Sequence, residues 1–298
     1  MNPRIPYRLA PGKPLARGNL PGSLIVHLVV NVEYWPFEKP MPRKLMGGPH
    51  GDDAVPDVLN YGWFEYGMRC GLRRLLDLGR EFGIPMSAST NSAVIGAYPQ
   101  AAEAILAAGW EFIAHGVTQT SLAKEDDERA TILRALDEFE AFSGARPRGW
   151  LSPGLRESLH TPDLLEQAGV EYVFDWALDD LPCWMDTSRG SLLAMPYGLE
   201  LNDSVLFAEQ KQTSREYERR IADTLSVYET EIQAEPRILT LPLHPHLMGV
   251  PHRYAVLRRA VDTLLKRPDT TFASGAQIAD WFIAQVPKPR CKPPSPDE

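Results

Sequence analysis

Two polar residues, Asn31 and Glu33, end an apolar run that has the length of a β-strand. The segment VHLVVNVEYW (residues 26–35) is rich in valine and leucine and then turns polar before a Trp-Pro pair. A buried parallel strand that ends in a carboxylate is a common way for an α/β enzyme to present a catalytic group. Glu33 is therefore the first candidate for a catalytic base. The alternative is a solvated carboxylate, because most carboxylates in proteins are exposed.

Polar or aromatic side chains follow six further apolar runs in the same way. His115 follows WEFIA (residues 110–114) and His244 follows ILTLPL (residues 238–243). Because the parallel strands of a barrel end at one rim, where loops build active sites, we expect these side chains to lie together. A single histidine at a strand end could equally be a hydrogen-bonded scaffold residue. The other members of the set are Thr90, Asn91, Thr118, Gln119, Trp150, Ser152, Asp175 and Tyr197.

Groups of these types could hydrolyse an amide. The reaction needs a base that activates water, a group that stabilises the oxyanion and an acid that protonates the departing nitrogen. Glu33 is the candidate base, and His115 and His244 are candidates for the other two roles, because imidazole titrates near neutral pH. The residues predicted to contact a planar substrate are the polar Asn31, Asn91, Gln119, Asp175, Tyr197 and His246 and the aromatic Tyr34, Trp35, Trp150 and Trp176. Packing in the core or a lid is the alternative role of the aromatic rings.

Alternating helix and strand patterns must position these residues. Such alternation predicts an α/β fold with a mostly parallel sheet, and the count fits one closed barrel of seven or eight strands. The predicted strands lie near residues 25–30, 86–88, 111–114, 149–151, 171–174, 192–195, 238–243 and 270–273. The predicted helices span residues 64–82, 99–108, 125–144, 161–168, 214–234 and 254–266, with a last helix that ends near residue 286.

Proline and glycine set the domain limits that we expect. Residues 1–22 should form an irregular arm, residues 23–287 a single barrel domain and residues 288–298 a frayed Pro-rich tail. The connection from residue 36 to 62 is longer than most loops that only join two elements. Loops of this length in compact domains are usually functional or disordered. We expect it to lie over the site.

Composition excludes several classes of partner. The chain has 298 residues, 44% of them hydrophobic, and a net charge of −8, which argues against a nucleic-acid or anionic-membrane surface. The three cysteines, Cys70, Cys183 and Cys291, are widely spaced and suggest neither a disulfide framework nor a zinc knuckle. The sequence shows neither a signal peptide nor a long apolar stretch, so we expect a cytoplasmic protein with a small-molecule substrate.

Six motifs, in this order, resemble the polysaccharide deacetylase (NodB-homology) superfamily. They are VVNVEYW, AHGVTQTSL, GWLSPG, VFDWALDDLPCW, MPYGLELND and LPLHPHLMGVPHR, and they extend over most of residues 24–285. Within the superfamily they are most similar to the allantoinase-type branch, which is associated with urate catabolism and cyclic imide hydrolysis. The resemblance implies a distorted (β/α)7-type barrel, hydrolysis of a C–N amide bond and a homo-oligomer, either a dimer or a tetramer.

The departures from the superfamily pattern concern the metal. Metal-dependent members carry two aspartates in the first motif and a HxxxH pair in the second, whereas this chain has Asn31 and Glu33 in the first and Gln119 in place of the second histidine. Only Glu33 and His115 remain as ligands that zinc prefers. We therefore expect no cofactor, or a weakly bound divalent metal such as zinc. The superfamily arginine of the third motif is replaced by Trp150.

The resemblance also implies roles for residues in the later motifs. His244 matches the histidine of the LHP motif, His246 is a candidate supporting residue, and His252 is expected in the turn before the next helix. Asp175 and Asp180 match a segment in which an aspartate orients a catalytic histidine, with helix capping or a turn as the alternative.

Three hypotheses for function follow. The first is a metal-independent or weakly metal-dependent hydrolase that opens a small cyclic ureide or imide. The second is a metal-dependent deacetylase of N-acyl groups or carbohydrates. The third is a catalytically inactive barrel that acts as a binding module, which the loss of the metal aspartate and histidine favours and the retention of Glu33, His115 and His244 opposes.

Overall fold

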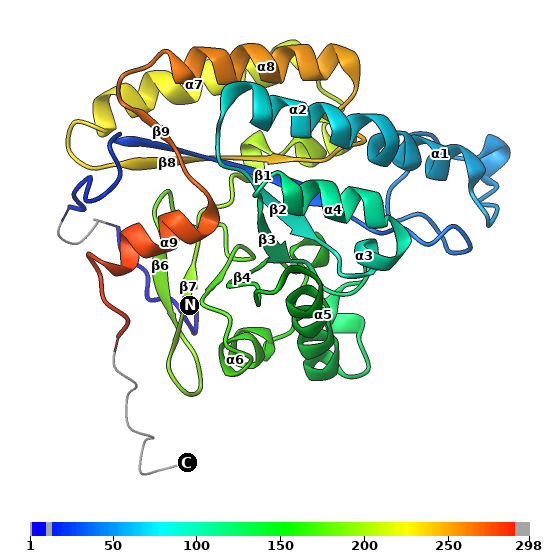
Figure 1. Cartoon of the computed structure of the whole chain (residues 1–298), viewed down its shortest axis with the longest axis horizontal. Helices are drawn as coiled ribbons and strands as arrows, with labels where there is room; N and C mark the ends of the chain where they lie inside the picture. The colour runs from blue at the N-terminus through cyan, green and yellow to red at the C-terminus, as the bar shows by residue number, and fades with distance from the viewer. Residues whose placement is uncertain (1, 10–13, 290–298) are drawn as a thin grey trace.

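The computed structural model describes residues 2–9 and 14–289, and a curled sheet lies at its centre with helices packed around it (Figure 1). In these residues the strands are β1 (Leu24–Val32), β2 (Ser87–Thr90), β3 (Glu111–Ala114), β4 (Gly149–Trp150), β5 (Tyr172–Val173), β6 (Cys183–Asp186), β7 (Ser191–Ala194), β8 (Arg237–Leu243) and β9 (Thr270–Phe272). The α-helices are α1 (Val58–Tyr66), α2 (Leu72–Phe82), α3 (Ala93–Ala97), α4 (Pro99–Ala107), α5 (Glu128–Ser143), α6 (Thr161–Gln167), α7 (Ser214–Glu231), α8 (Pro251–Leu265) and α9 (Gly275–Ile283). The shorter helical segments are η1 (Pro49–Gly51), η2 (Gly67–Gly71), η3 (Leu122–Lys124), η4 (Pro153–Leu155), η5 (Leu199–Leu201) and η6 (Ser204–Glu209).

The sheet is parallel except at one edge, where β6 pairs antiparallel with β7. Its strand order is β6-β7-β5-β4-β3-β2-β1-β8, and β9 pairs with the first part of β1 while β2 pairs with the last part. The predicted mostly parallel α/β architecture is confirmed. Strand β6 was not predicted. In the described part of the chain no pairing joins β8 to β6 or β7, so the single-domain barrel is distorted and incompletely closed.

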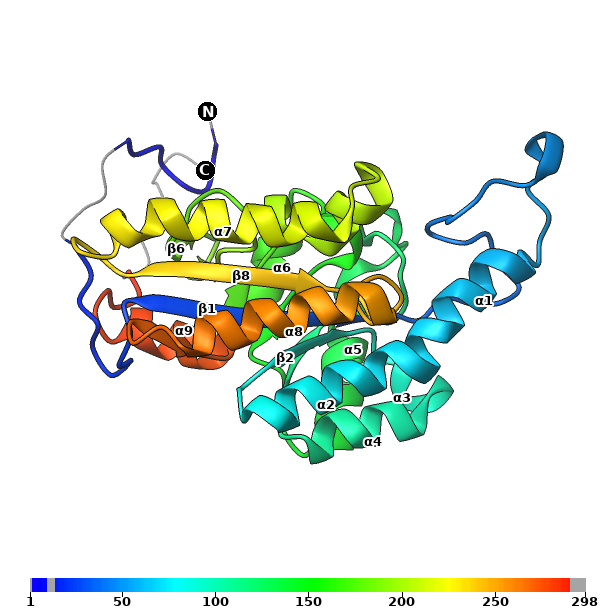
Figure 2. The ribbon, with the colours of Figure 1, turned by 90° about the horizontal axis from the view of Figure 1, so that it is seen from above.

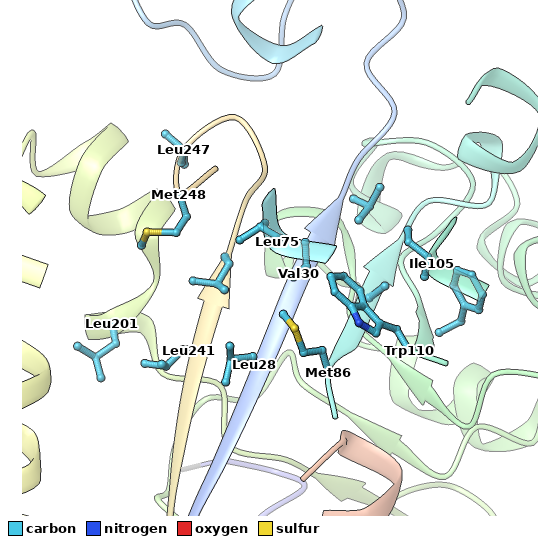
Figure 3. Close-up of a cluster of buried hydrophobic side chains, with 14 of the residues drawn as sticks. Leu28, Val30, Leu75, Met86, Ile105, Trp110, Leu201, Leu241, Leu247 and Met248 are labelled. Carbon is cyan, nitrogen blue, oxygen red and sulfur yellow. The ribbon is translucent and has the colours of Figure 1, made fainter. Parts of the chain in front are cut away.

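Alternate residues of β1 point to two different cores. Leu24, Val26, Leu28, Val30 and Val32 belong to a large cluster that the outer helices cover. Figure 3 shows Leu28 and Val30 in this cluster with residues from other elements such as Leu75. The intervening residues face the barrel interior, where Ile25 and Val29 belong to a second cluster. Because side chains alternate along a strand, Asn31 and Glu33 continue the interior series beyond Val29.

Helices enclose the sheet from outside, and α9 serves the interior cluster. Figures 1 and 2 show α2, α7 and α8 along the outer side of β1 and β8, and α4 and α5 beside β2 and β3. Helix α9 contributes Ile278, Trp281 and Phe282 to the cluster that contains Ile25. No helix in the described residues is long and apolar enough to cross a membrane.

The predicted helix over residues 64–82 is longer than expected and is interrupted. It begins at Val58, where the side chain of Asp57 accepts a hydrogen bond from the backbone N–H of Asn60, and it contains the π-helical segment η2. A Cβ atom at Gly67 or Gly71 would overlap backbone atoms of the segment that follows β8. The glycines therefore permit close backbone packing that the apolar pattern did not reveal.

Two terminal segments and one long connection complete the chain. Residues 2–9 and 14–22 contain no helix or strand, and residues 290–298 of the predicted tail lie outside the described residues. The long connection after β1 contains η1, which projects away from the sheet beyond the end of α1 (Figure 2). His252 lies in the first turn of α8, not in the turn before it, because Pro251 already starts the helix.

Candidate functional site

A cavity of about 550 Å³ opens where the parallel strands end. Its volume suits a small ligand. Seven of the residues predicted for the site line it: Asn31, Glu33, His115, Gln119, Asp175, Tyr197 and His244. Further lining residues include Arg43, Arg156, Asn202, Ser204 and Glu209.

Glu33 is buried in the wall of this cavity with both carboxylate oxygens in use. Oε2 accepts a hydrogen bond from Trp35 Nε1 at 2.7 Å, and Oε1 accepts one from Gln119 Nε2 at 2.9 Å. His244 Nε2 lies 3.5 Å from Oε1. Burial alone would raise the pKa of Glu33, but the hydrogen bond and charge of His244, with the charge of Arg43, hold that pKa well below its usual range. Glu33 is therefore ionised at neutral pH.

His244 is the protonated histidine of the site. Its Nδ1 lies 2.6 Å from Asp203 Oδ1, and its backbone N–H donates to Asp203 Oδ2 at 2.7 Å. Burial alone would lower the pKa of His244, but the carboxylates of Asp203 and Glu33 raise it to about 9. His244 is consequently protonated at neutral pH, with Nδ1–H on Asp203 and Nε2–H toward Glu33. This is the arrangement of a general acid whose orientation a buried carboxylate fixes.

His115 is held in the opposite protonation state. Its Nδ1 lies 2.6 Å from the carbonyl oxygen of Leu151. A carbonyl oxygen can only accept, so Nδ1 carries the proton and Nε2 keeps its lone pair. Burial lowers the pKa of His115 and outweighs the charge of Glu33, which would raise it. The neutral ring therefore offers a proton acceptor in the cavity wall.

Asn31 and Tyr197 form a neutral part of the wall. Asn31 Nδ2 donates to the Tyr197 hydroxyl at 3.0 Å and to the carbonyl oxygen of Leu243 at 3.3 Å. Burial raises the pKa of Tyr197 well above its usual value, so its hydroxyl remains protonated. Both residues continue the interior series of their strands.

The structure does not place Trp150 on the cavity wall, contrary to expectation. Its ring belongs to the cluster beneath the outer helices, and its Nε1 donates to Ser152 Oγ at 3.0 Å. Leu151, the next residue, lines the cavity instead. The prediction was wrong because the last residue of the strand faces the outer side of the sheet and the next residue faces the cavity.

Five other residues predicted to contact substrate do not line the cavity. Trp35 stacks on Phe64 with ring centroids 4.6 Å apart, and Trp176 Nε1 donates to Glu157 Oε1 at 2.7 Å. The proposed aromatic sandwich is therefore not formed by these rings. The remaining three are Tyr34, Asn91 and His246.

Asn91 and His246 support the site from behind. The Asn91 side chain donates to the carbonyl oxygen of His115 and accepts from the backbone N–H of Tyr34 at 2.8 Å, so it ties the ends of two strands together. His246 is buried against the rings of Trp35 and Trp63, and burial lowers its pKa well below the usual value. It is a neutral packing residue here.

The aspartate that orients the histidine is Asp203, not Asp175 or Asp180. Asp175 accepts from the backbone N–H and hydroxyl of Ser152 at 2.7 and 2.5 Å, and Asp180 accepts from the Tyr228 hydroxyl. Asp203 lies directly before η6, outside any strand end. The LND sequence that contains it was the available signal.

Two cations in the cavity wall were also missed. Arg43 comes from the long connection after β1, and Arg156 follows η4. Neither residue follows a strand directly, so the strand-end pattern could not identify them. The expectation that the connection lies over the site is met only where Arg43 reaches the cavity, because η1 projects away from the sheet.

The divalent metal that the resemblance implies does not fit the donor atoms present. Among the described residues no group of three or more His, Cys, Asp and Glu side chains could hold a metal ion. Both Glu33 oxygens accept hydrogen bonds, and His244 is protonated on Asp203. A catalytic zinc site usually has three protein ligands, and His115 and Glu33 supply at most two.

Comparisons with known proteins agree with the fold. The model of the polysaccharide deacetylase family matches residues 57–173. A Schizosaccharomyces pombe protein described as a polysaccharide deacetylase is 27% identical over 245 residues, which are 75% of this chain and 76% of that protein. The crystal structure of PuuE allantoinase superposes with a TM-score of 0.81 at 26% identity and covers 95% of this chain and 97% of its own.

A Pseudomonas aeruginosa PAO1 structure described as a polysaccharide deacetylase superposes with a TM-score of 0.80 at 25% identity, over 94% of this chain and 96% of its own. The two structural likenesses each cover more than nine-tenths of this chain. The resemblance to the polysaccharide deacetylase superfamily is therefore confirmed, and the protein is a hydrolase of carbon–nitrogen bonds other than peptide bonds.

Proposed function

We propose that this protein opens the ring of a small cyclic ureide or imide by hydrolysis of an amide bond. The observation that carries the proposal is the meeting of three groups in one cavity: the ionised Glu33, the protonated His244 and the neutral His115. The likeness to PuuE allantoinase over nearly the whole chain supports the cyclic substrate.

The side chains divide the steps of the reaction among them. Attack of water on the ring carbonyl needs a proton acceptor, and Glu33 and the unprotonated Nε2 of His115 are the two candidates. The Nε2–H of His244 is placed to stabilise the oxyanion and then to protonate the ring nitrogen as the C–N bond breaks. Asp203 keeps this imidazolium oriented. The ring opens to a carboxylic acid and an amine or urea nitrogen on the same molecule.

Unpaired polar atoms favour a ligand with both donors and acceptors. Gln119 Oε1 and Arg43 Nη1 are buried without a hydrogen-bond partner, and both residues line the cavity. A buried polar atom without a partner costs about 1–3 kcal/mol, which a ligand can recover. The N–H of a ring amide fits Gln119 Oε1, and an acceptor outside the ring fits Arg43 Nη1.

A metal-dependent deacetylase of N-acyl groups or carbohydrates is the second candidate. It is supported by the match to the polysaccharide deacetylase model and by the Schizosaccharomyces pombe relative. The donor set of the cavity speaks against it, because that set lacks a third ligand among the described residues.

A screen of small substrates separates the two candidates. The purified protein is assayed on hydantoins, succinimide, allantoin and dihydropyrimidines and, in parallel, on N-acetylglucosamine oligomers, with zinc content measured in the same sample. We expect turnover of at least one cyclic amide and none of the N-acetyl sugars. Deacetylation of the sugars together with stoichiometric metal would favour the second candidate. Absence of turnover on both sets would favour the inactive binding module.

A further inference from the structure

One cation in the cavity wall has no partner that would explain its position. Arg43 lines the cavity, and its Nη1 is buried without a hydrogen bond. Among the described residues no carboxylate lies within ion-pair distance of it, whereas the half-buried Arg237 pairs with Glu231 and Glu235. Arg43 is close enough to Glu33 for its charge to act on that carboxylate. The guanidinium is thus an incompletely paired charge in the cavity wall near Glu33.

Hydrogen bonds from one buried side chain hold the backbone that follows Arg43. The buried side chain of Asn60 accepts from the backbone N–H of Leu45 at 2.7 Å and donates to the carbonyl oxygen of Met46 at 2.9 Å. Asp57, the cap of α1, accepts from the Asn60 Nδ2 atom at 2.7 Å. The backbone two residues after Arg43 is therefore attached to the start of a helix, which restricts the chain that carries the arginine.

The chemistry of the group defines what it would bind. An arginine is always charged and presents a planar fork of N–H donors that matches the two oxygens of a carboxylate. Burying one of its donors without a partner is costly, and a carboxylate is the partner that recovers most of this cost. Among the described residues Glu33 forms no ion pair with Arg43, and its two oxygens accept hydrogen bonds from Trp35 and Gln119.

We infer that Arg43 is a specificity-determining residue that binds a carboxylate on the substrate, so that the enzyme prefers cyclic amides with an acidic substituent. The cyclic amide part of this inference rests on the proposed function, and the carboxylate part rests on Arg43 alone. The carboxylate takes no part in bond breaking. It anchors the ring while Glu33, His115 and His244 act on the amide.

Binding of inert compounds tests the anchor independently of turnover. Cyclopentanecarboxylate and the neutral cyclopentylmethanol have no ring amide, and calorimetric titration compares them on the wild type, Arg43→Gln and Arg43→Lys. We expect the wild type to bind the carboxylate about 10- to 100-fold more tightly than the alcohol. Arg43→Gln should abolish this preference, and Arg43→Lys, which keeps the charge but loses the fork, should retain part of it.

Kinetics then compare hydantoin with hydantoin-5-acetate. Arg43→Gln should lower kcat/KM for the acid about 10- to 100-fold and leave kcat/KM for hydantoin within a few-fold of the wild type. Lys44→Gln is the matched control: it removes the ion pair of the next residue with Asp53 and should leave the preference unchanged.

Three results would overturn the anchor: equal binding of the two inert compounds, binding of neither, or a preference that survives Arg43→Gln. Failure of the proposed function looks different, since the carboxylate preference in binding would then persist without turnover of either hydantoin.

Discussion

Glu33 combines burial, hydrogen bonds and a neighbouring charge in one side chain. Its carboxylate is buried, accepts two hydrogen bonds and lies beside the protonated ring of His244. Glu33→Gln keeps the shape but removes the charge, so we expect turnover to fall by about 10²–10⁴-fold. The pKa of His244 should also fall, because the charge and hydrogen bond of Glu33 help to raise it. Steady-state kinetics and NMR titration of the histidine measure the two effects.

Glu81→Gln provides the control for this substitution. Glu81 is an exposed residue in an ion pair with Arg258, and its replacement should leave both turnover and the His244 titration unchanged. Wild-type turnover in Glu33→Gln would remove Glu33 from the mechanism and leave His115 as the base. In that case the acid limb of the kcat/KM profile should lie below the ordinary histidine pKa, since burial lowers the pKa of His115.

His244 makes both activity and stability depend on pH. Its pKa in the folded protein is about 9, above the ordinary value of 6.5, because Asp203 and Glu33 outweigh the effect of burial. The stabilisation is therefore complete below pH 6.5 and is lost as the pH rises through about 9. We expect the free energy of unfolding and kcat/KM both to decline over this interval, as urea unfolding and a pH–rate profile would show.

Asp203→Asn tests the cause of this pH dependence. The substitution removes the largest attraction that raises the pKa of His244, so the alkaline limb of kcat/KM should move to lower pH. A purely structural role for Asp203 would lower activity equally at every pH. An unmoved limb would therefore show that Asp203 does not set the protonation state of His244.

The residues found from sequence and those missed differ in how they reach the cavity. Glu33, His115 and His244 directly follow strands, and the strands could be recognised from their apolar runs. Asp203 and Arg43 lie in segments without a periodic pattern. The LND sequence was the available signal for Asp203, and Arg43 is identified by its place in the cavity wall.

At the scale of the element, the alternation of side chains along a strand explains why Asn31 and Glu33 were correctly placed at the cavity and why Trp150 was not. Asn31 and Glu33 are two residues apart and share the interior side of β1 with Val29. Trp150 and Leu151 are adjacent, so they face opposite sides, and the one that reaches the cavity is Leu151. The strand positions were predictable from composition, but the side of a two-residue strand such as β4 was not. Strand β6 was missed because its antiparallel pairing with β7 departs from the alternation of helix and strand.

The π-helical segment η2 supports the loop that carries His244. A Cβ at Gly71 would overlap the carbonyl oxygen of Pro245 and crowd Gly249. Gly71→Ala should therefore displace this loop, lower kcat/KM more than about 10-fold and destabilise the fold by about 1–3 kcal/mol. Kinetics and urea unfolding of the same sample measure both effects.

Gly62→Ala is the matched control on the preceding helix. A Cβ at Gly62 meets nothing within 4 Å, and alanine favours a helix by about 0.8–1.0 kcal/mol over glycine. This variant should retain activity and be equally or more stable. Wild-type activity in Gly71→Ala would show that the close packing of η2 does not position His244.

For the molecule as a whole, the barrel architecture resembles that of the solved relatives. The charged side chains in its cavity, however, are not arranged as the ligands of a metal site. PuuE allantoinase matches 95% of this chain in space at 26% identity. The sheet delivers an ion pair between Glu33 and His244 to the place where strand ends meet. The same fold can thus support hydrolysis through side-chain acids and bases, and the metal is the component whose role needs a direct test.

The last prediction concerns that metal. His115 and Glu33 are two potential ligands, and a two-ligand site should bind zinc weakly. We expect purified protein to contain well under one equivalent of zinc by mass spectrometry, and we expect its activity to survive prolonged treatment with a chelator. Gln119→His places a third imidazole or carboxylate ligand in the wall and should raise the zinc content without being required for turnover. If chelation abolished activity and added zinc restored it, water activation by Glu33 or His115 alone would be ruled out, and a rearranged site that recruits a further ligand such as His246 would take its place.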